Sequence, residues 1–514
     1  MSERLPESEG APVREDAALG RRRTGVELDP EQFARLGHRL VDDVAELLGT
    51  LRTRPLALGE TPGQVAEALG ASRPLPERGQ DPERVLEEAT RLLLEHSLYN
   101  GHPRFFGYIT AGPAPLGVLA ELLAAAVNPN AGSWNLSPMA TAMESQAVRW
   151  IAELVGFPAG GGGLLVSGGN VANMIGLWAA RAAKAGWDVR ARGTGAGPPL
   201  RVYGQAGMHT WIQKATDLAG LGTDAIRWLG TDAEGRLEPA ALRERMQADR
   251  RSGDVPFLVV GTAGSVATGA VDPLPALRAV CDEMGAWLHV DGAYGAFAAC
   301  APGAPDDLRG LALADSVALD PHKWLYAPLE AGCVLVRDAG ALPAAFAYHP
   351  DYYRFEPDAP SYFEHGLQNS RGFRALKVWM LLKQMGREGY ARAIAGDIEL
   401  ARRFYELAGA HAELEALTRG LSITTYRYVP ADLRARASEP AVASYLDALN
   451  SEIRDRIERS GRAFVSNAVV GGAYALRMCI VNFRTRLEDV TALADLTVEI
   501  GRAADRELRP AALG

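Results

Sequence analysis

Two stretches of this sequence determine the expected fold: residues 316–325, SVALDPHKWL, and residues 287–294, WLHVDGAY. Each begins with a short apolar run, which is typical of a buried strand. Lys323 follows the first run and Asp291 follows the second. Because open α/β sheets place their ligand-binding crevices at strand ends, we expect both side chains to lie near such a crevice.

The wider pattern predicts an α/β protein. From residue 164 onwards short apolar runs alternate with helical patterns, which favours a mainly parallel sheet with right-handed crossovers. The N-terminal region to residue 125 is mostly helical in pattern. A long helical pattern covers residues 373–385, and the C-terminal part after it mixes helices with short strands, which predicts a smaller α+β domain. The clearest strands are expected at 164–166, 200–203, 257–261 and 287–290, and the clearest helices at 172–184, 211–219 and 274–284.

Composition excludes several classes of function. The chain has 514 residues, a formal net charge of −9 and no basic tract, so we expect no nucleic-acid partner. No apolar run approaches the roughly 20 residues that span a bilayer, so we expect no membrane partner. Residues 1–25 are charged and rich in proline and glycine, which predicts a disordered leader. The scattered cysteines, without a CxxC motif, are typical of a reduced cytoplasmic protein.

A glycine-rich turn precedes the helix expected at 172–184. Gly168, Gly169 and Asn170 follow the strand at 164–166. Small residues there let backbone N–H groups approach an anion at the helix N-terminus, where the helix dipole favours negative charge. A phosphate group fits such a position, although the same residues also suit an ordinary tight turn with a cap.

Two further polar residues follow predicted strands. His209 opens a helix after the strand at 200–203, where an imidazole can stack on a planar cofactor and contact a substrate carboxylate. A single histidine is more often structural or exposed. Ser265 follows the strand at 257–261 and can supply hydroxyl and backbone contacts, although its segment also suits an ordinary turn.

These residues together indicate pyridoxal 5′-phosphate. The amine of Lys323 can form a Schiff base with the cofactor aldehyde, and the carboxylate of Asp291 can pair with the pyridine nitrogen. Alone, Lys323 would be interpreted as a solvated surface group and Asp291 as a turn residue. Their combination with the glycine turn and His209 favours a cofactor site.

From about residue 92 to residue 496 the sequence resembles the group II pyridoxal-phosphate-dependent amino-acid decarboxylases, which include aromatic-L-amino-acid and glutamate decarboxylases. The motifs that carry the resemblance are HPRFF (102–106), WNLSP (134–138), SGG (167–169), His209, HVDGA (289–293), PHKW (321–324), FRALK (373–377), and LR (476–477) with Asn482 and Arg484.

The resemblance implies the aspartate aminotransferase type of fold, which is fold type I of pyridoxal-phosphate enzymes. This fold has a mainly parallel seven-stranded sheet with helices on both faces and a smaller C-terminal α+β domain. It also implies an obligate homodimer with active sites shared at the interface. Lys323 would bind the cofactor covalently, His209 would stack on its ring and Asp291 would pair with its ring nitrogen. The other residues expected to bind the cofactor are Gly168, Gly169, Asn170, Ser265, Ala293, Asp320 and His322.

The family also has a mobile loop after the lysine, with a tyrosine thought to protonate the carbanion. Tyr352 stands at the matching place, which also suits a surface aromatic residue. Ile109 stands where members with aromatic substrates often have phenylalanine, and Ser265-Val266 stands where paired threonines are usual. These departures leave the cofactor site intact and the substrate side chain open.

We therefore expect decarboxylation of an L-amino acid, with an aromatic one favoured, to the amine and carbon dioxide. The alternatives are decarboxylation-dependent oxidative deamination to an aldehyde, and an aminotransferase or lyase reaction; Tyr352 favours the amine. A catalytically inactive regulatory homologue would normally lack Lys323. The expected division is a leader (1–25), an N-terminal helical dimer arm (26–115), a large cofactor domain (116–385) and a small domain (386–514).

Overall fold

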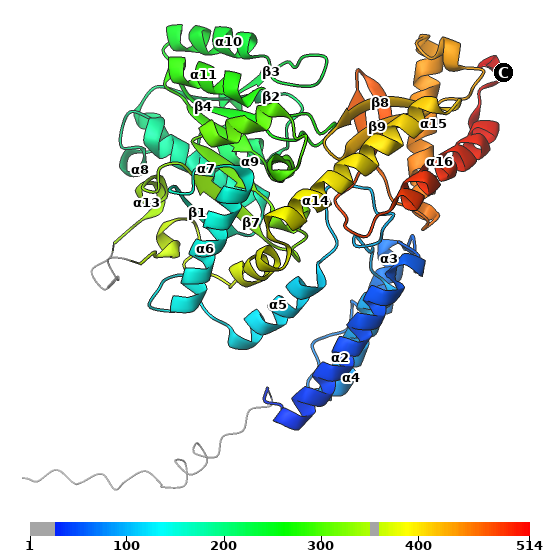
Figure 1. The fold of residues 1–514 in the computed structure, drawn as a ribbon, viewed down its shortest axis with the longest axis horizontal. Coiled ribbons are helices and arrows are strands. Elements are labelled where there is room, and N and C mark those ends of the chain that lie inside the picture. The colour runs from blue at the N-terminus through cyan, green and yellow to red at the C-terminus, as the bar shows by residue number, and fades with distance from the viewer. Residues whose placement is uncertain (1–25, 350–358, 514) are drawn as a thin grey trace, which may run out of the picture. The chain divides into compact units, whose positions relative to one another are not determined.

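The computed structural model describes residues 26–349 and 359–513 (Figure 1). The chain divides into two compact units, Met1–Leu98 and Tyr99–Gly514. The predicted leader at 1–25 lies outside the described residues. The helices of the first unit are α2 (Pro30–Thr50), α3 (Pro62–Leu69) and α4 (Pro82–Glu95).

Local sequence fixes the starts of these three helices. Each begins with proline, preceded by a capping residue: Asp29, Thr61 and Asp81 each accept a hydrogen bond from a backbone N–H of the first turn. Proline at the first helical position and a polar cap before it are both favourable, because the first-turn N–H groups have no partner within the helix.

The second unit is built on a seven-stranded sheet in the order β1-β7-β6-β5-β4-β2-β3. β7 is antiparallel to both its neighbours, and the other pairs are parallel. This confirms the predicted fold class. The strands are β1 (Gly162–Val166), β2 (Leu200–Gln205), β3 (Ile226–Leu229), β4 (Val255–Thr262), β5 (Trp287–Asp291), β6 (Ser316–Leu319) and β7 (Gly332–Val336).

Helices cover both faces of this sheet, as expected (Figure 1). One layer contains α7 (Gly169–Lys184), α9 (Trp211–Leu218) and α13 (Ala341–Phe346). The opposite layer contains α6 (Pro138–Val155), α10 (Pro239–Arg251), α11 (Leu274–Met284) and the start of α14 (Ala375–Ala410). The remaining helices of this unit's large part are α5 (Pro115–Val127), α8 (Val189–Arg192) and α12 (Pro321–Trp324).

Strand β5 shows how alternation sorts side chains between the layers. Leu288 and Val290 pack in the layer that contains α11. Trp287 packs in the other layer. Because alternate strand residues face the same side, His289 and Asp291 point with Trp287 towards α7 and α9. The polar residues of this strand therefore share one face.

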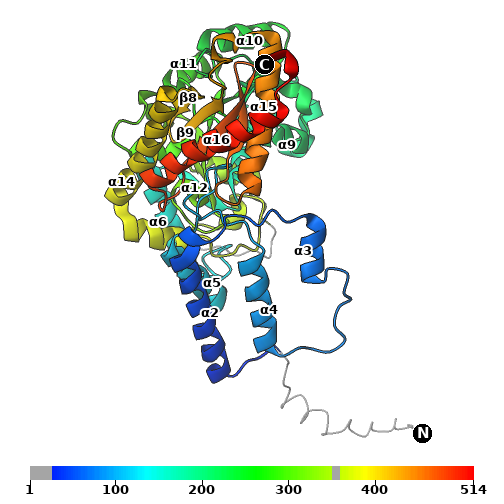
Figure 2. The same ribbon diagram turned by 90° about the vertical axis from the view of Figure 1, so that its right-hand side faces the viewer.

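The C-terminal region forms an antiparallel sheet in the order β10-β11-β9-β8, which confirms the predicted smaller α+β domain. Helices α15 (Pro440–Arg459) and α16 (Leu487–Leu508) lie side by side against it (Figure 2). Helix α14 reaches this sheet after a kink at Gly386, where φ is +60°. The strands are β8 (Leu414–Gly420), β9 (Ile423–Tyr428), β10 (Ser466–Val470) and β11 (Ala473–Cys479). No helix of the described residues is long and apolar enough to cross a bilayer.

Candidate active site

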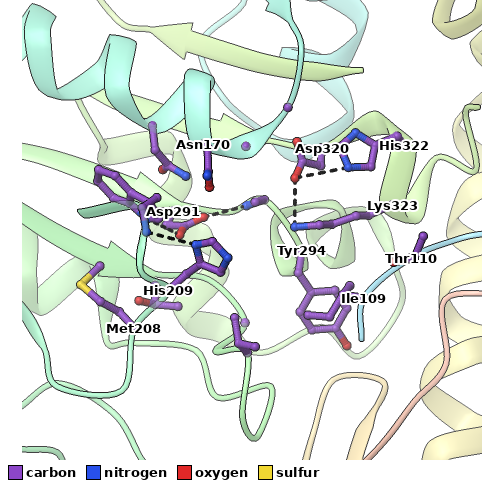
Figure 3. Close-up of a pocket in the computed structure, with 18 residues that line it drawn as sticks. Ile109, Thr110, Asn170, Met208, His209, Asp291, Tyr294, Asp320, His322 and Lys323 are labelled. Carbon is purple, nitrogen blue, oxygen red and sulfur yellow. Dashed lines mark hydrogen bonds and ion pairs between the residues drawn. The ribbon is translucent and has the colours of Figure 1, made fainter. Parts of the chain in front are cut away.

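A cavity of about 360 Å³ lies beyond the carboxyl ends of β1, β2, β4, β5 and β6 (Figure 3). The segments that follow these strands all contribute to its wall, as expected for a parallel sheet. The lining residues are Ile109, Thr110, Gly168, Gly169, Asn170, Asn173, Met208, His209, Trp211, Thr262, Gly264, Val266, Asp291, Ala293, Tyr294, Asp320, His322 and Lys323.

Lys323 lies in the short helix α12, which begins directly after β6 and Asp320. Its Nζ is 2.9 Å from Oδ2 of Asp320. Asp320 is buried, and its Oδ1 has no hydrogen-bond partner among the described residues. Nε2 of His322 is 3.8 Å from the same Oδ2. Burial lowers the pKa of His322, and its Nδ1 donates to the carbonyl of Ala331 at 2.7 Å.

Asp291 ends β5 and points towards Lys323 across the cavity (Figure 3). Its Oδ2 accepts a hydrogen bond from Nε1 of Trp211 at 2.7 Å. Its Oδ1 accepts one from the backbone N–H of Ala293 at 3.2 Å. These two donors fix the orientation of the carboxylate, and a carboxylate is the group that can pair with a protonated pyridine nitrogen.

His209 lies between β2 and α9, close to Asp291 (Figure 3). The backbone N–H of Trp211 donates to its Nδ1 at 3.2 Å, so in the neutral ring the proton is on Nε2. Partial loss of solvation lowers the pKa of His209, although the Asp291 charge opposes this shift. The side chain remains accessible from the cavity, and a neutral imidazole there can offer its flat face to a planar ring.

Gly169 begins α7 beside Asp320. A Cβ atom at this position would lie 2.7 Å from Oδ2 of Asp320 and 3.1 Å from Cβ of Ala293. Only glycine fits this space without displacing a neighbour. Gly168 and Asn170 complete a turn whose backbone N–H groups lie at the N-terminus of a long helix, which suits a phosphate group.

The structure brings nearly all of the predicted cofactor residues into this one cavity. Ser265 is the exception, since only its neighbours Gly264 and Val266 line the wall. Its Oγ is instead 2.9 Å from Oγ1 of Thr268 and accepts a hydrogen bond from the backbone N–H of Ala270 at 3.2 Å. The cofactor contact of Ser265 stays a prediction, and Tyr352 lies outside the described residues.

Asn173, Trp211 and Tyr294 are among the lining residues that were not predicted from the sequence. Asn173 stands three residues after Asn170 on α7, a spacing that places both on one face of a helix. Trp211 stands two residues after His209. Tyr294 stacks on Trp324 with ring centroids 4.9 Å apart. Helical spacing could have indicated Asn173, whereas the other two depend on tertiary contacts.

The lining residues fit pyridoxal phosphate chemically. A lysine amine suits its aldehyde, a charged carboxylate suits its ring nitrogen, and the Gly169 turn suits its phosphate. Two buried polar atoms at the cavity, Oδ1 of Asp320 and Oγ1 of Thr262, have no hydrogen-bond partner among the described residues. Unsatisfied buried polar atoms are rare in proteins, so a polar ligand here is expected. The described residues contain no cluster of three or more metal-ligating side chains.

Comparison with known proteins identifies the family. The pyridoxal-dependent decarboxylase conserved domain matches residues 62–425. The chain is 31% identical over 470 residues to an aromatic-L-amino-acid decarboxylase of Bacillus atrophaeus, covering 90% of this chain and 94% of that protein. It is 29% identical over 471 residues to a phenylacetaldehyde synthase of a Rosa hybrid cultivar, covering 88% and 90% of the two chains.

A solved structure agrees with these sequence relatives. The crystal structure of Oryza sativa TDC with PLP and tryptamine matches with a TM-score of 0.86 and 27% identity, covering 93% of this chain and 99% of that chain. The chain belongs to the pyridoxal-dependent decarboxylase family. It is an amino-acid decarboxylase, and its cofactor is pyridoxal 5′-phosphate.

Proposed function

We propose that this enzyme converts an aromatic L-amino acid into its amine and carbon dioxide, using Lys323, Asp291 and His209 to hold the cofactor. The observation that carries the proposal is the meeting of these three residues with the Gly169 turn in one cavity. The aromatic substrate is supported by similarity to an aromatic-L-amino-acid decarboxylase. The apolar wall residues Ile109, Met208 and Val266 support an apolar substrate side chain.

When bound, pyridoxal phosphate supplies an electron-accepting pyridine ring for the electron pair left as the carboxylate departs. Lys323 presents its amine to the cofactor aldehyde, and Asp320 orients that amine from 2.9 Å. Asp291 holds the proton on the ring nitrogen through charge pairing. His209 supports the ring face. Selection of decarboxylation then depends on how the cavity orients the substrate bonds, because orientation decides which bond can break.

The second candidate reaction is oxidative deamination coupled to decarboxylation, which yields an aldehyde. It is favoured by similarity to a phenylacetaldehyde synthase. In that reaction oxygen and water are consumed, and aldehyde, carbon dioxide, ammonia and hydrogen peroxide are released. In the family, phenylalanine in place of the loop tyrosine accompanies the aldehyde outcome, so Tyr352 favours the amine. An aminotransferase or other lyase reaction on the same scaffold is a more distant alternative.

A substrate panel distinguishes these reactions. The holoenzyme is incubated with each of the twenty common amino acids, and carbon dioxide, amine, aldehyde, ammonia and oxygen uptake are measured. We expect equal amounts of amine and carbon dioxide from one or more of tryptophan, tyrosine and phenylalanine, without oxygen uptake. Aldehyde with matching oxygen uptake would support the second candidate. Turnover confined to acidic or small aliphatic amino acids would overturn the aromatic assignment.

The proposed assembly is a homodimer whose active sites are shared between subunits. Helix α5 supports it, because Leu119, Leu122, Leu123 and Val127 are 52%, 55%, 51% and 66% exposed. Their spacing places them along one helix face, and an exposed apolar stripe of this kind is typical of an interface. A symmetric pair buries the same surface on both partners, which suits a second copy of this chain.

The dimer is tested by introducing a charge into this stripe. Leu122→Glu should lower the molar mass in sedimentation to that of one chain, and Leu218→Glu, at a similarly exposed residue on α9, should not. A wild-type protein that is monomeric and active at micromolar concentration would contradict the assembly.

The remaining assignments concern domains and location. We propose a helical dimer arm at 26–115, a cofactor domain at 116–385 and a small domain at 386–514. The last boundary coincides with the kink at Gly386.

A cytoplasmic location is supported by the four free cysteines, since disulfides are rare in reducing compartments. Cell fractionation with an antibody to the chain tests this location.

A further inference from the structure

Trp211 contacts both residues that are proposed to hold the cofactor ring. Its indole Nε1 donates to Oδ2 of Asp291 at 2.7 Å. Its backbone N–H donates to Nδ1 of His209 at 3.2 Å. The side chain is fully buried, so neither hydrogen bond competes strongly with water. A single residue therefore contacts two groups from different segments, the end of β5 and the loop after β2.

In its contact with Asp291 the indole of Trp211 can act only as a hydrogen-bond donor. An indole N–H donates a hydrogen bond and cannot accept one, so it cannot take a proton from the carboxyl group. The second oxygen of Asp291 is occupied by the N–H of Ala293. Hydrogen bonds donated to a carboxylate stabilise its charged form and lower its affinity for a proton.

We propose that Trp211 is a positioning residue whose indole N–H holds the Asp291 carboxylate in the orientation that pairs with the cofactor, so that the proton between them stays on the ring nitrogen. This inference rests on the proposed role of Asp291. Its consequence is that the electron-accepting strength of the ring depends on a residue that does not touch the nitrogen. The backbone contact adds a second effect, since it fixes the tautomer and the tilt of His209.

The indole is itself held by neutral polar groups. The ring of His289 meets it edge-on, with centroids 5.8 Å apart and planes at 79°. Nε2 of His289 donates to Oδ1 of Asn173 at 2.7 Å, and Nδ1 lies 2.7 Å from Oγ of Ser316. Burial lowers the pKa of His289 to about 4, so it carries no charge near neutral pH. The indole is thus oriented by an uncharged neighbour on this side.

The test measures the protonation of the cofactor nitrogen directly. The holoenzyme is loaded with pyridoxal phosphate carrying ¹⁵N in the ring, and its chemical shift is compared with those of the free cofactor in acid and in base. We expect a pyridinium-like shift in the wild type and a shift towards neutral pyridine in Trp211→Phe. In turnover, Trp211→Phe should lower kcat about 10-fold with little change in KM, as for loss of one hydrogen bond to a charged group.

Trp379→Phe is the matched control. Its indole Nε1 donates to Oε1 of Gln146, also at 2.7 Å, and it does not line the cavity. Trp379→Phe should therefore keep the wild-type ¹⁵N shift. Asp291→Asn is measured beside it. If Asp291→Asn itself stays pyridinium-like, the proposed role of Asp291 fails. If Asp291→Asn loses the ring proton while Trp211→Phe keeps it, the role of Trp211 alone is overturned.

A second variant covers the case in which Trp211→Phe does not fold. Site-specific incorporation of β-(3-benzothienyl)alanine at position 211 keeps the fused-ring shape and removes the N–H donor. It should reproduce the ¹⁵N change with unaltered thermal stability. A wild-type shift in this isosteric variant would overturn the proposal, because only the hydrogen bond to Asp291 has been removed.

Discussion

The two aspartates of the candidate active-site cavity differ in how fully the chain satisfies their carboxylate oxygens. At the end containing Asp291, both carboxylate oxygens accept hydrogen bonds. At the end containing Lys323, Asp320 has one oxygen on the lysine amine and one without a partner among the described residues. The protein itself therefore fixes both oxygens of Asp291, whereas Asp320 has one oxygen left for a ligand.

This difference suits the two kinds of work proposed for these ends. A group that tunes a ring must keep one orientation, and fixed hydrogen bonds provide that orientation before the cofactor binds. A lysine that reacts must exchange partners, so a single contact to Asp320 holds the amine without blocking it. The following predictions disturb each end in turn, beginning with the largest expected effect.

Lys323→Ala removes the reactive amine that lies beside Asp320. Because a lysine of this kind both binds the aldehyde and transfers protons, we expect turnover to fall on the order of 10³-fold or more. Borohydride reduction of the wild-type holoenzyme, followed by peptide mass analysis, should place the pyridoxyl group on Lys323. A label on a different lysine would contradict the assignment. Lys383→Ala, which removes an exposed lysine of α14, should leave turnover unchanged.

Tyr352→Phe tests a residue that lies outside the described ranges. We expect carbon dioxide release to continue while amine formation falls by about 10² to 10⁴, the usual contribution of a positioned proton donor. Oxygen should then divert the product towards aldehyde and ammonia, measured together with carbon dioxide. If Tyr353→Phe suppresses the amine and Tyr352→Phe does not, the loop tyrosine is Tyr353. If neither change matters, the proton comes from another group.

Asp291→Asn replaces the carboxylate whose two oxygens both accept hydrogen bonds. An amide cannot carry the charge that pairs with the pyridinium nitrogen, and an opposite charge at such a site shifts a pKa by about 1 to 3 units. We therefore expect turnover to fall about 10- to 10³-fold while most of the cofactor stays bound, as measured by absorbance after dialysis. Turnover close to wild type would show that the ring nitrogen is protonated by other means.

Asp397→Asn tests a buried carboxylate that accepts hydrogen bonds from the segment after Lys323. Asp397 accepts hydrogen bonds from Nε1 of Trp324 at 2.9 Å and from the Tyr326 hydroxyl at 3.0 Å. Trp324 directly follows Lys323, and Tyr326 stands three residues after it. Burial raises the pKa of Asp397 to about 7, although these donors oppose the shift. Above that pH the carboxylate accepts from them as an anion.

The sign of the resulting pH dependence follows from proton binding. An unfolded aspartate loses its proton near pH 3.9, whereas folded Asp397 keeps its proton up to about pH 7. The free energy of unfolding should therefore fall by about 1.4 kcal/mol per pH unit within this window. Asp397→Asn removes that slope, which urea unfolding at several pH values measures as a difference from wild type.

Asp249→Asn is the contrasting control for this effect. Burial alone would raise the pKa of Asp249, but hydrogen bonds from Tyr203 and Arg227 outweigh it and lower the pKa. Its contribution to stability is therefore present above the unfolded pKa and lost as the pH falls. The two difference curves should have opposite slopes. Parallel curves would mean that folded Asp397 does not keep its proton up to about pH 7.

The sequence alone determined the fold class, the family and most of the site. A short apolar run is a local feature of the sequence. Strands β1, β2, β4 and β5 were therefore predictable from such runs between helical patterns. Residue chemistry at strand ends is also local, which is why Lys323, Asp291, His209 and the glycine turn were found without a structure. Parallel strands then bring these ends to one edge of the sheet.

Only the tertiary structure decided which of these residues touch. The antiparallel direction of β7 and the bond between Trp211 and Asp291, 80 residues apart, depend on strand order. Neither periodicity nor composition records that order. Ser265 illustrates the same limit, since its position after a strand is visible in the sequence and its turn back to Thr268 is not. The direction of a side chain depends on its packed neighbours, and these are set by the whole fold.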